Sequence, residues 1–385
     1  MKKMLSTILG IMLFMMMIPG TVRAAEIYDV KIYTSRYSFT QVTSDNMHDV
    51  LNDGTISYDP STCTLTLDGA KIDRILTYGN ESKTLTINVV SDSTITANGN
   101  GISLQASSTA GPVFHRDKLI LTGKGKLTIT TQNSGQIGIS AFDDTIIENA
   151  NIEITTPSTP IAVADQNGAP GGDLTVRNSH LELVVTGTEG NGFWIQNGDL
   201  TIDNSTVEVN ASGSDYPALW VLNKTEIIGD STLTINSGYG NAIYTRGDLL
   251  LDASKLFVYD QEWAAPMLYI EGSVTIQNQS QVEALSKGDC GMYTEGSIQI
   301  LNSTLETSGL YNGIITNGDL LIKNAKLTST AQEGGSIYAT NQMNVINSTL
   351  KAIVNDPSLG TAITYDKLTI DSSDVEAIGG IMNQY

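Results

Sequence analysis

The sequence predicts an all-β fold: a single-stranded parallel β-helix of about a dozen three-strand coils, closed at its N-terminal end by a cap. Three observations carry this prediction. A unit of 22 to 29 residues repeats from about Lys118 onward, its apolar segments alternate with period 2, and its joints are rich in Gly, Asn, Asp and Ser. Helical periodicity is nearly absent.

The repeat is clearest where the first strand of each coil begins. These starts are 22 to 26 residues apart and fall at Leu174, Leu200, Glu226, Leu249, Val274, Ile298, Leu320, Met343 and Leu368. Within one coil, segments 200–202, 207–209 and 219–221 each alternate apolar with polar residues, as strands do when one face is buried. We therefore expect three parallel sheets, each gaining one strand per coil.

A column of asparagines supports the same stacking. The residue four positions after most strand starts is Asn149, Asn178, Asn204, Asn278, Asn302, Asn324 or Asn347. We expect these amides to hydrogen-bond along the axis and to satisfy polar groups at a buried corner. The column resembles the asparagine ladder of right-handed parallel β-helices, the architecture of pectate lyases, and this resemblance implies right-handed coils.

The chain divides into three segments. Residues 1–24 read as a signal peptide, because two lysines precede an apolar run and a small-x-small cleavage site. Residues 25–62 are expected to cap the solenoid, with a strand at 28–33, a short helix opening at Ser44 and Asp45, and a turn at 52–54. Residues 63–385 are expected to form the β-helix. We therefore expect a secreted protein, extracellular or at the cell surface.

The net charge excludes some classes of partner, and the positions of the two cysteines exclude a disulfide as a source of stability. The formal charge of −20 becomes −23 when the three basic residues of the signal peptide are removed, and such a surface repels nucleic acid and anionic membranes. No second apolar span follows the signal peptide, so membrane insertion is not expected. Cys63 and Cys290 lie about eight coils apart, roughly 38 Å at strand spacing, and are too distant for a disulfide.

Segments 54–60 and 64–70 look like the entry to the helical domain of secreted bacterial β-helix proteins of the carbohydrate-binding type, which have a non-catalytic, pectate-lyase-like fold. Together with the repeats, this resemblance covers most of the mature chain. It implies a glycan-binding or surface role without chemistry, and extracellular polysaccharide as the partner.

An aromatic column gives the candidate binding residues. The outward position of the third strand is Trp194, Trp220, Tyr244, Tyr269, Tyr293 and Tyr338 in successive coils, interrupted by Ile315. At about 4.8 Å per coil these rings form an exposed stripe on which sugar rings can dock. Arg246 is the nearest cationic donor, and Trp263, just before the strand of Tyr269, is expected to overhang the stripe.

Several alternatives stay open at this level. The rings would also stabilise the sheet without any ligand, or form a protein interface in an adhesin or matrix protein that self-associates. A lyase or hydrolase is a further alternative, although no acidic pair or nucleophile motif marks a common face, so no catalytic residue is assigned. An outward glutamate column that includes Glu153, Glu182 and Glu208 leaves calcium open, but no cofactor is expected.

Overall fold

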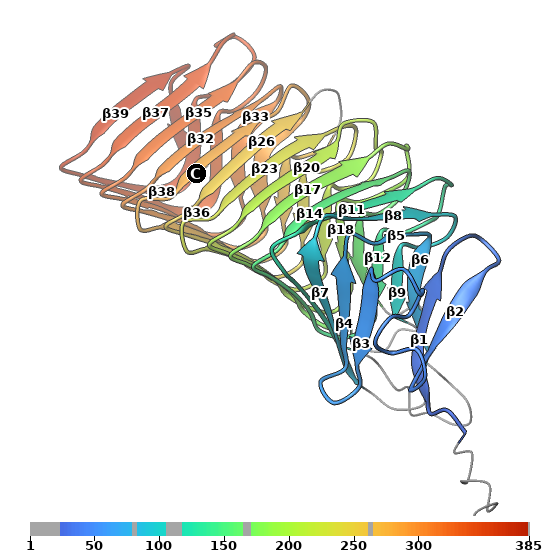
Figure 1. Ribbon diagram of the computed structural model, residues 1–385. Helices are drawn as coiled ribbons and strands as arrows, with labels where there is room; N and C mark the ends of the chain where they lie inside the picture. Colours follow the sequence, from blue (N-terminus) through green and yellow to red (C-terminus); the bar gives the residue numbers. More distant parts are fainter. Residues whose placement is uncertain (1–23, 79–82, 105–117, 165–170, 261–264, 384–385) are drawn as a thin grey trace, which may run out of the picture.

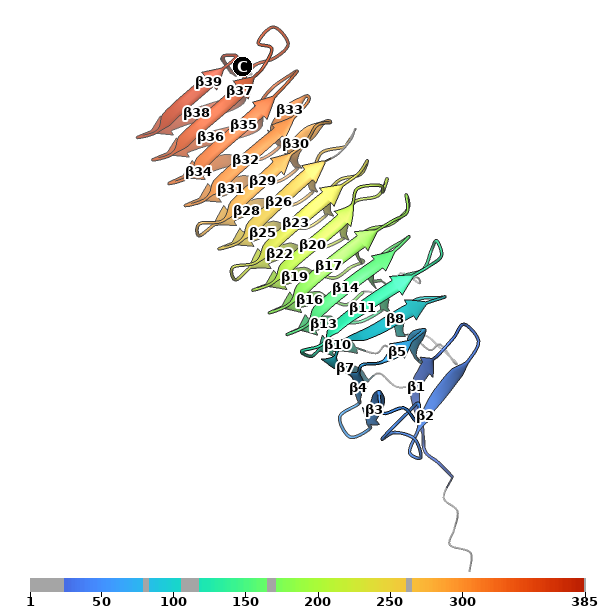
Figure 2. The same cartoon turned by 45° about the horizontal axis from the view of Figure 1, so that its top comes forward.

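The computed structural model describes residues 24–78, 83–104, 118–164, 171–260 and 265–383. These residues form a parallel β-solenoid of about 11 turns and contain no helix, which confirms the predicted all-β architecture. Figure 1 shows the coils stacked into a rod, with β1 and β2 (blue) at one end and β39 (red) at the other, and Figure 2 shows the strands side by side along its length. The right-handed winding stays a prediction.

Three columns of parallel strands run along the rod. The first column contains β4 (Thr64–Asp68), β7 (Thr84–Ser91), β10 (Lys118–Thr122), β13 (Thr145–Glu148), β16 (Leu174–Arg177), β19 (Leu200–Asp203), β22 (Thr225–Ile228), β25 (Leu249–Asp252), β28 (Val274–Gln277), β31 (Ile298–Leu301), β34 (Leu320–Lys323) and the second parts of β36 (Ile337–Ile346) and β38 (Ile363–Asp371).

The middle column is a separate sheet made of β5 (Lys71–Ile72), β8 (Ser93–Ala97), β11 (Lys126–Thr131), β14 (Asn151–Thr156), β17 (His180–Val185), β20 (Thr206–Ala211), β23 (Thr232–Ser237), β26 (Lys255–Asp260), β29 (Gln281–Leu285), β32 (Thr304–Gly309), β35 (Lys326–Ala331), β37 (Thr349–Val354) and β39 (Asp374–Ile378).

The third column contains β6 (Arg74–Thr77), β9 (Ile102–Leu104), β12 (Ile139–Ala141), β15 (Ile161–Val163), β18 (Phe193–Ile195), β21 (Leu219–Val221), β24 (Ile243–Thr245), β27 (Leu268–Ile270), β30 (Cys290–Thr294), β33 (Asn312–Thr316), the first parts of β36 and β38, and β40 (Ile381–Asn383).

Inward positions of all three columns form one continuous core. In the coil of β19, β20 and β21, the side chains exposed by 1% or less include Leu200, Ile202, Val207, Val209, Leu219 and Val221. Each packs beneath its counterpart one coil away, because the strands pair in register. The period-2 pattern therefore fixes which side chains face outward.

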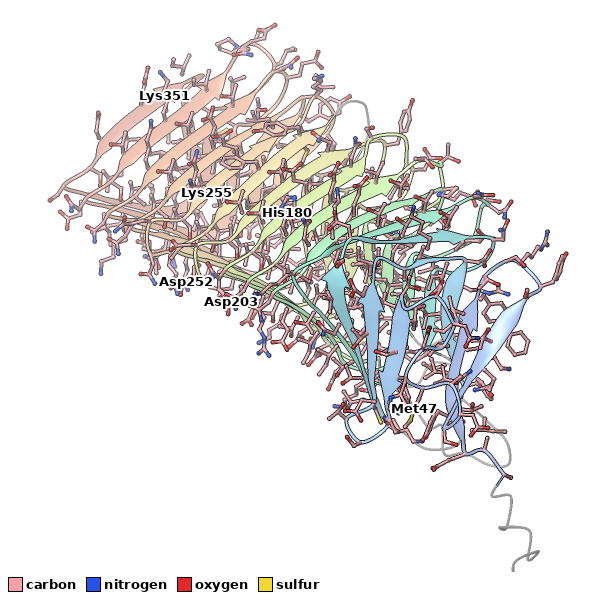
Figure 3. All side chains as sticks on the ribbon, viewed as in Figure 1. Met47, His180, Asp203, Asp252, Lys255 and Lys351 are labelled. Carbon is pink, nitrogen blue, oxygen red and sulfur yellow. The ribbon has the colours of Figure 1, made fainter. Side chains whose placement is uncertain are left out.

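The N-terminal end is closed by antiparallel strands. β1 (Ile27–Tyr33) pairs with β2 (Phe39–Thr43) and with β6, while β3 (Ile56–Asp59) pairs with β4. Buried Val42 and Val50, together with Met47, cover the open core, and Figure 3 places Met47 in this cap. Antiparallel strands therefore cover the N-terminal edges of the first and third columns, so these edges offer no parallel template.

The short helix expected at Ser44 and Asp45 is wrong, because this segment forms turns. The Asn46 carboxamide accepts a hydrogen bond from the Thr43 backbone N–H at 2.8 Å and donates one to the Gln41 carbonyl at 2.9 Å. Such local side-chain bonds compete with helical ones. The expected turn at 52–54 is present, with φ of 57° at Asn52 and 77° at Gly54.

The asparagine column is aligned as predicted, but its place at a buried corner is wrong. All seven asparagines are exposed, and their φ angles lie between 46° and 59°. Asparagine is favoured there because it tolerates left-handed backbone. Amide-to-amide bonds join Asn204 to Asn178 and Asn347 to Asn324, each at 2.7 Å.

The buried ladder lies one or two residues later and is made of serines. The backbone N–H of Ser179 donates to Ser205 Oγ at 3.1 Å, Ser205 donates to Ser231 at 3.1 Å, and Ser231 donates to Ser254 at 3.2 Å. The hydroxyl of Ser205 in turn donates to the Asp203 carbonyl of its own turn at 2.7 Å. These hydroxyls satisfy backbone groups that the turns bury.

The C-terminal end differs from the N-terminal end. Val345 in the first column is fully buried, whereas Ile370, its partner in the last coil, is 46% exposed. Ile381 in the third column is 47% exposed, although its partner Ile363 is fully buried. Among the described residues, nothing covers the last coil as the cap covers the first.

Both cysteines are free thiols, as their distance along the chain predicts. Cys290 is buried in β30, and burial raises the pKa of its thiol to about 12. The described part of the chain is therefore held together by stacking and hydrogen bonds.

Candidate functional site

The aromatic column lies on the outer face of the third column of strands in the predicted register. Trp194 pairs with Trp220, Trp220 with Tyr244, Tyr244 with Tyr269, and Tyr269 with Tyr293. Ile315 follows Tyr293, and Tyr338 follows Ile315. Toward the N-terminus the same position holds the small residues Ala162, Ser140 and Ser103. An aromatic cluster is thus exposed on one surface of the solenoid.

Three tyrosines of this column cover one another. The rings of Tyr244 and Tyr269 stack with centroids 5.5 Å apart and 19° between their planes, and those of Tyr269 and Tyr293 with 5.1 Å and 22°. A ring stacked on both sides presents its edge outward, and a sugar needs the ring face for its C–H groups. The middle of the column is therefore closed to face-on contact.

The phenol groups of this stack also have partners. Tyr244 donates to Glu271 Oε1 at 2.6 Å, Tyr269 donates to Glu295 Oε1 at 3.5 Å, and Asn317 Nδ2 donates to the Tyr293 oxygen at 3.1 Å. Desolvation, followed by the bond to Glu271, raises the pKa of Tyr244 to about 12. Desolvation also raises the pKa of Tyr269.

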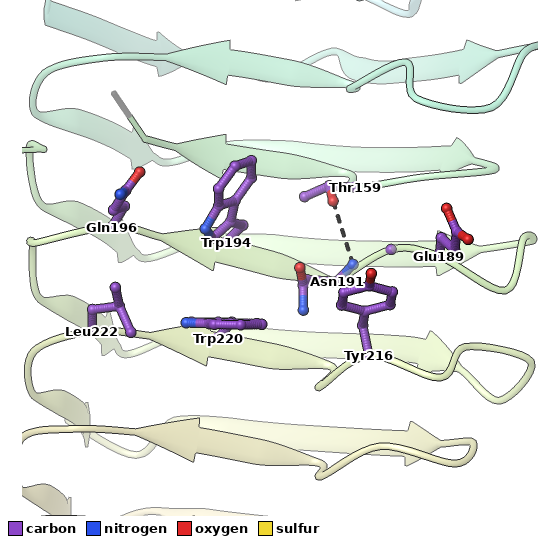
Figure 4. A pocket seen from close by; sticks show the side chains of 9 residues that line it. Thr159, Glu189, Asn191, Trp194, Gln196, Tyr216, Trp220 and Leu222 are labelled. Carbon is purple, nitrogen blue, oxygen red and sulfur yellow. Dashed lines mark hydrogen bonds between the residues drawn. The ribbon is translucent and has the colours of Figure 1, made fainter. Parts of the chain in front are cut away.

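The two tryptophans at the N-terminal end of the column are arranged differently. Trp220 contacts Tyr244 edge to face, with centroids 5.6 Å apart and 61° between the planes. A pocket of about 430 Å³ opens between Trp194 and Trp220. In Figure 4 the Trp220 indole is seen edge-on and the Trp194 indole stands upright beside it. Indole surface is therefore available in this pocket.

Two loops between middle and third strands complete the pocket. Residues 186–192 and 212–218 contribute Glu189, Gly190, Asn191 and Tyr216 to its wall. Ser214 Oγ ties the loops together by donating to the Gly190 carbonyl at 2.7 Å. Gly192 is required at the loop end, because a Cβ there would lie 2.3 Å from Val209 Cγ1.

Polar groups lie around the aromatic surface. Asn191 Nδ2 donates to the Pro217 carbonyl at 2.6 Å, and its backbone N–H donates to Thr159 Oγ1 at 3.3 Å, the dashed line of Figure 4. Gln196 and Leu222 line the opposite end of the pocket from Glu189 and Tyr216 (Figure 4). An apolar floor with a few polar groups at its edges is typical of small-molecule sites.

The remaining predicted site residues lie away from this pocket or are engaged. Arg246 Nε is 3.3 Å from Glu271 Oε2, so its charge is paired. Tyr338 is 37% exposed and is separated from the stack by Ile315. Trp263 lies outside the described residues. Ligand contact by the individual rings of the column stays a prediction.

Sequence reasoning missed the loop residues of the pocket, including Tyr216, Asn191 and Glu189. A signal for Tyr216 was present, because tyrosines recur just before the third strand at Tyr216, Tyr239 and Tyr311. All three are exposed, by 43%, 49% and 49%. The position of Asn191 depends on loop geometry, for which the repeat contains no signal.

The outward glutamates are aligned as predicted, with Glu153 beside Glu182 and Glu182 beside Glu208. Lys126 pairs with Glu153 at 2.5 Å, which relieves part of the repulsion. His180, Lys255 and Lys351 lie on the same middle column (Figure 3), so this face carries mixed charge. Within the described ranges, no three His, Cys, Asp or Glu side chains are grouped to hold a metal ion.

The same ranges contain no helix that is long and apolar enough to cross a membrane. No curated protein and no solved structure matches the chain. Residues 38–214 match a protein family described as carbohydrate-binding domain-containing protein. This segment covers the cap from β2 onward and the coils as far as β20, and it ends two residues before Tyr216. Residues 38–214 of this β-solenoid are therefore similar to the carbohydrate-binding domain family.

Proposed function

We propose that this protein binds extracellular polysaccharide in the pocket between Trp194 and Trp220 and performs no chemistry on it. The observation that carries the proposal is the exposed indole surface in a pocket of about 430 Å³, within and beside the segment that matches a carbohydrate-binding family. Pyranose rings present C–H faces that pack on indole, and their hydroxyls require polar partners at the edge.

The pocket supplies both kinds of contact. Trp194, Trp220 and Leu222 provide apolar surface, while Gln196 and Glu189 provide hydrogen-bonding groups. The volume lies near the lower end of the range for ligand pockets, which suits a short stretch of a longer chain. The arrangement recognises a glycan by shape and stacking.

The place of action follows from the predicted signal peptide. Cleavage after residue 24 would release the solenoid outside the cell, where polysaccharides are the abundant ligands. Mass spectrometry of the protein from culture supernatant and from cells tests this. A mature N-terminus near Ala25 in the supernatant supports export, and an uncleaved cytoplasmic chain contradicts it.

Calorimetric titration with soluble polysaccharides, neutral and acidic, with and without calcium, tests the function. The wild-type protein should bind at least one polymer saturably. The variant with both Trp194→Ala and Trp220→Ala should lose binding and keep its circular dichroism spectrum. Tyr311→Ala is the control, because it removes an exposed aromatic ring from a coil outside the pocket.

The same samples separate the other functions. Release of reducing ends or unsaturated sugars would show a hydrolase or lyase. Absence of binding to every polymer, together with self-association that Trp220→Ala abolishes, would show that the aromatic cluster is a protein interface.

A further inference from the structure

The pocket has a long direction, and it follows the strands. One coil contributes, in chain order, Glu189, Asn191, Trp194 and Gln196, and the next contributes Tyr216, Trp220 and Leu222. Figure 4 shows these two rows side by side, with Glu189 and Tyr216 at one end and Gln196 and Leu222 at the other. Because strand residues advance about 3.3 Å each, the six steps from Tyr216 to Leu222 span up to roughly 20 Å.

The perpendicular direction, along the solenoid axis, offers less surface. Toward the C-terminus the Tyr244 ring packs on Trp220, and beyond it the tyrosine stack presents edges whose hydroxyls are already bonded. Toward the N-terminus the column changes to Ala162, which is 2% exposed. A chain lying along the axis would therefore meet open ring faces at the two tryptophans, then the edges of the stack, and a further separate ring only at Tyr338, beyond Ile315.

A chain lying parallel to the strands meets apolar groups along its whole length. Tyr216 is 43% exposed at one end, the indoles occupy the centre, and Leu222 lies at the other end. Polar atoms accompany this path at both ends, from the Glu189 carboxylate and the Gln196 carboxamide. Successive sugar units along this path would thus each lie on an apolar side chain, with polar groups beside the first and the last unit.

We infer that the glycan chain lies parallel to the strands, along two neighbouring coils and across the solenoid axis. Tyr216 and Leu222 then contact the sugar units on either side of the tryptophans. This inference rests on the proposed function and adds to it the ligand class, a linear glycan recognised over several consecutive units. The tyrosines from Tyr244 to Tyr293 are then outside the contact surface.

Affinity measured against oligosaccharide length tests the inference. The probes are linear oligomers, from disaccharide to hexasaccharide, of the polymer that binds best. Wild-type affinity should rise with length and level off when the oligomer spans the pocket. Tyr216→Ala and Leu222→Ala should each weaken hexasaccharide binding by at least about fivefold and disaccharide binding much less. Tyr311→Ala, at the equivalent loop position of a later coil, should leave both unchanged.

Spin labels provide a second readout that does not depend on pocket mutations. In a Cys63→Ser background, nitroxides at Asp215→Cys and at Asn223→Cys lie at the two ends of the glycan path. One at Gln299→Cys lies in β31, in the first column of strands. Each of the two end labels should broaden most strongly the proton signals of the sugar unit nearest to it, so the two labels should affect opposite ends of the bound hexasaccharide. The third label should broaden none of these signals.

Each outcome has a distinct meaning. Unchanged affinity in Tyr216→Ala and Leu222→Ala, together with weaker binding in Tyr293→Ala and Tyr338→Ala, would show that the glycan does not lie parallel to the strands. Glycan binding itself would still stand. Failure of every oligomer and polymer to bind the wild-type protein would overturn the proposed function itself.

Discussion

The aromatic column contains two arrangements that the sequence does not distinguish. From Tyr244 to Tyr293 the rings lie nearly parallel and cover one another, whereas Trp194 and Trp220 border an open pocket. Coil spacing explains the first arrangement, since rings repeated about every 4.8 Å on flat strands are close enough to stack. The comparison teaches that the ring faces of an aromatic stripe are open to a ligand only where stacking is interrupted.

The strongest test of this comparison removes the open pair. Replacing Trp194 and Trp220 by alanine together should weaken polysaccharide binding by at least about 100-fold, because each buried aromatic anchor contributes roughly 2 kcal/mol or more. Isothermal titration calorimetry measures the loss. Equal binding by the folded variant would contradict the assignment of the pocket.

Opening the stack should affect stability and leave binding unchanged. Tyr269→Ala removes two ring contacts and should lower the free energy of unfolding by about 1 to 3 kcal/mol, since each aromatic pair contributes about 0.5 to 1.5 kcal/mol. Urea denaturation measures this, and Tyr269→Phe should keep most of the stability. A large loss of glycan affinity in Tyr269→Ala would show that the stack is itself a contact surface.

Alkaline pH should weaken the stack selectively. The fold raises the pKa of Tyr244 to about 12 from its ordinary 10.0, so it favours the neutral phenol. The resulting stabilisation is complete below pH 10 and is lost as the pH rises toward 12, because the folded state then binds more protons than the unfolded state. Urea titrations across this window should show a shallower decline for Tyr244→Phe than for wild type. Identical slopes would refute the role of Tyr244.

The smallest effect is expected at Arg246. Its side chain is 57% exposed and its guanidinium is paired with Glu271, so Arg246→Ala should change the free energy of unfolding by about 1 kcal/mol or less. Binding should change by less than about twofold. Calorimetry compares the variant with Arg177→Ala, whose ion pair with Glu148 lies in the first column. A tenfold loss of affinity in Arg246→Ala alone would show that Arg246 donates hydrogen bonds to the ligand.

The repeat allowed the fold to be predicted because strand alternation and coil length are local properties. The outward position of Trp194 and its pairing with Trp220 follow from period 2 and from the spacing of strand starts. The roles of Asn178 and Ser179 were harder to separate, because both recur in nearly every coil. Only backbone angles show that the first holds a left-handed turn and the second a buried hydrogen bond.

The pocket was less predictable because it depends on loops. Turns between first and middle strands contain two or three residues from β16 onward, whereas the loops that lead to the third strand contain two to eight. Asn191 and Tyr216 reach the tryptophans because both of their loops contain seven residues and are tied together through Ser214. Irregular insertions of this kind leave no periodic signal.

The serine ladder has a consequence for how such a protein diversifies. Ser205 and its counterparts join neighbouring coils on the edge of the rod away from the variable loops, with one interruption where Ala325 takes the serine position. Insertions near Tyr216 therefore leave these hydrogen bonds intact, so the loops around the pocket can change in length without changing the scaffold. Duplication of a whole coil would lengthen the rod by one unit and would add one more serine hydrogen bond between coils.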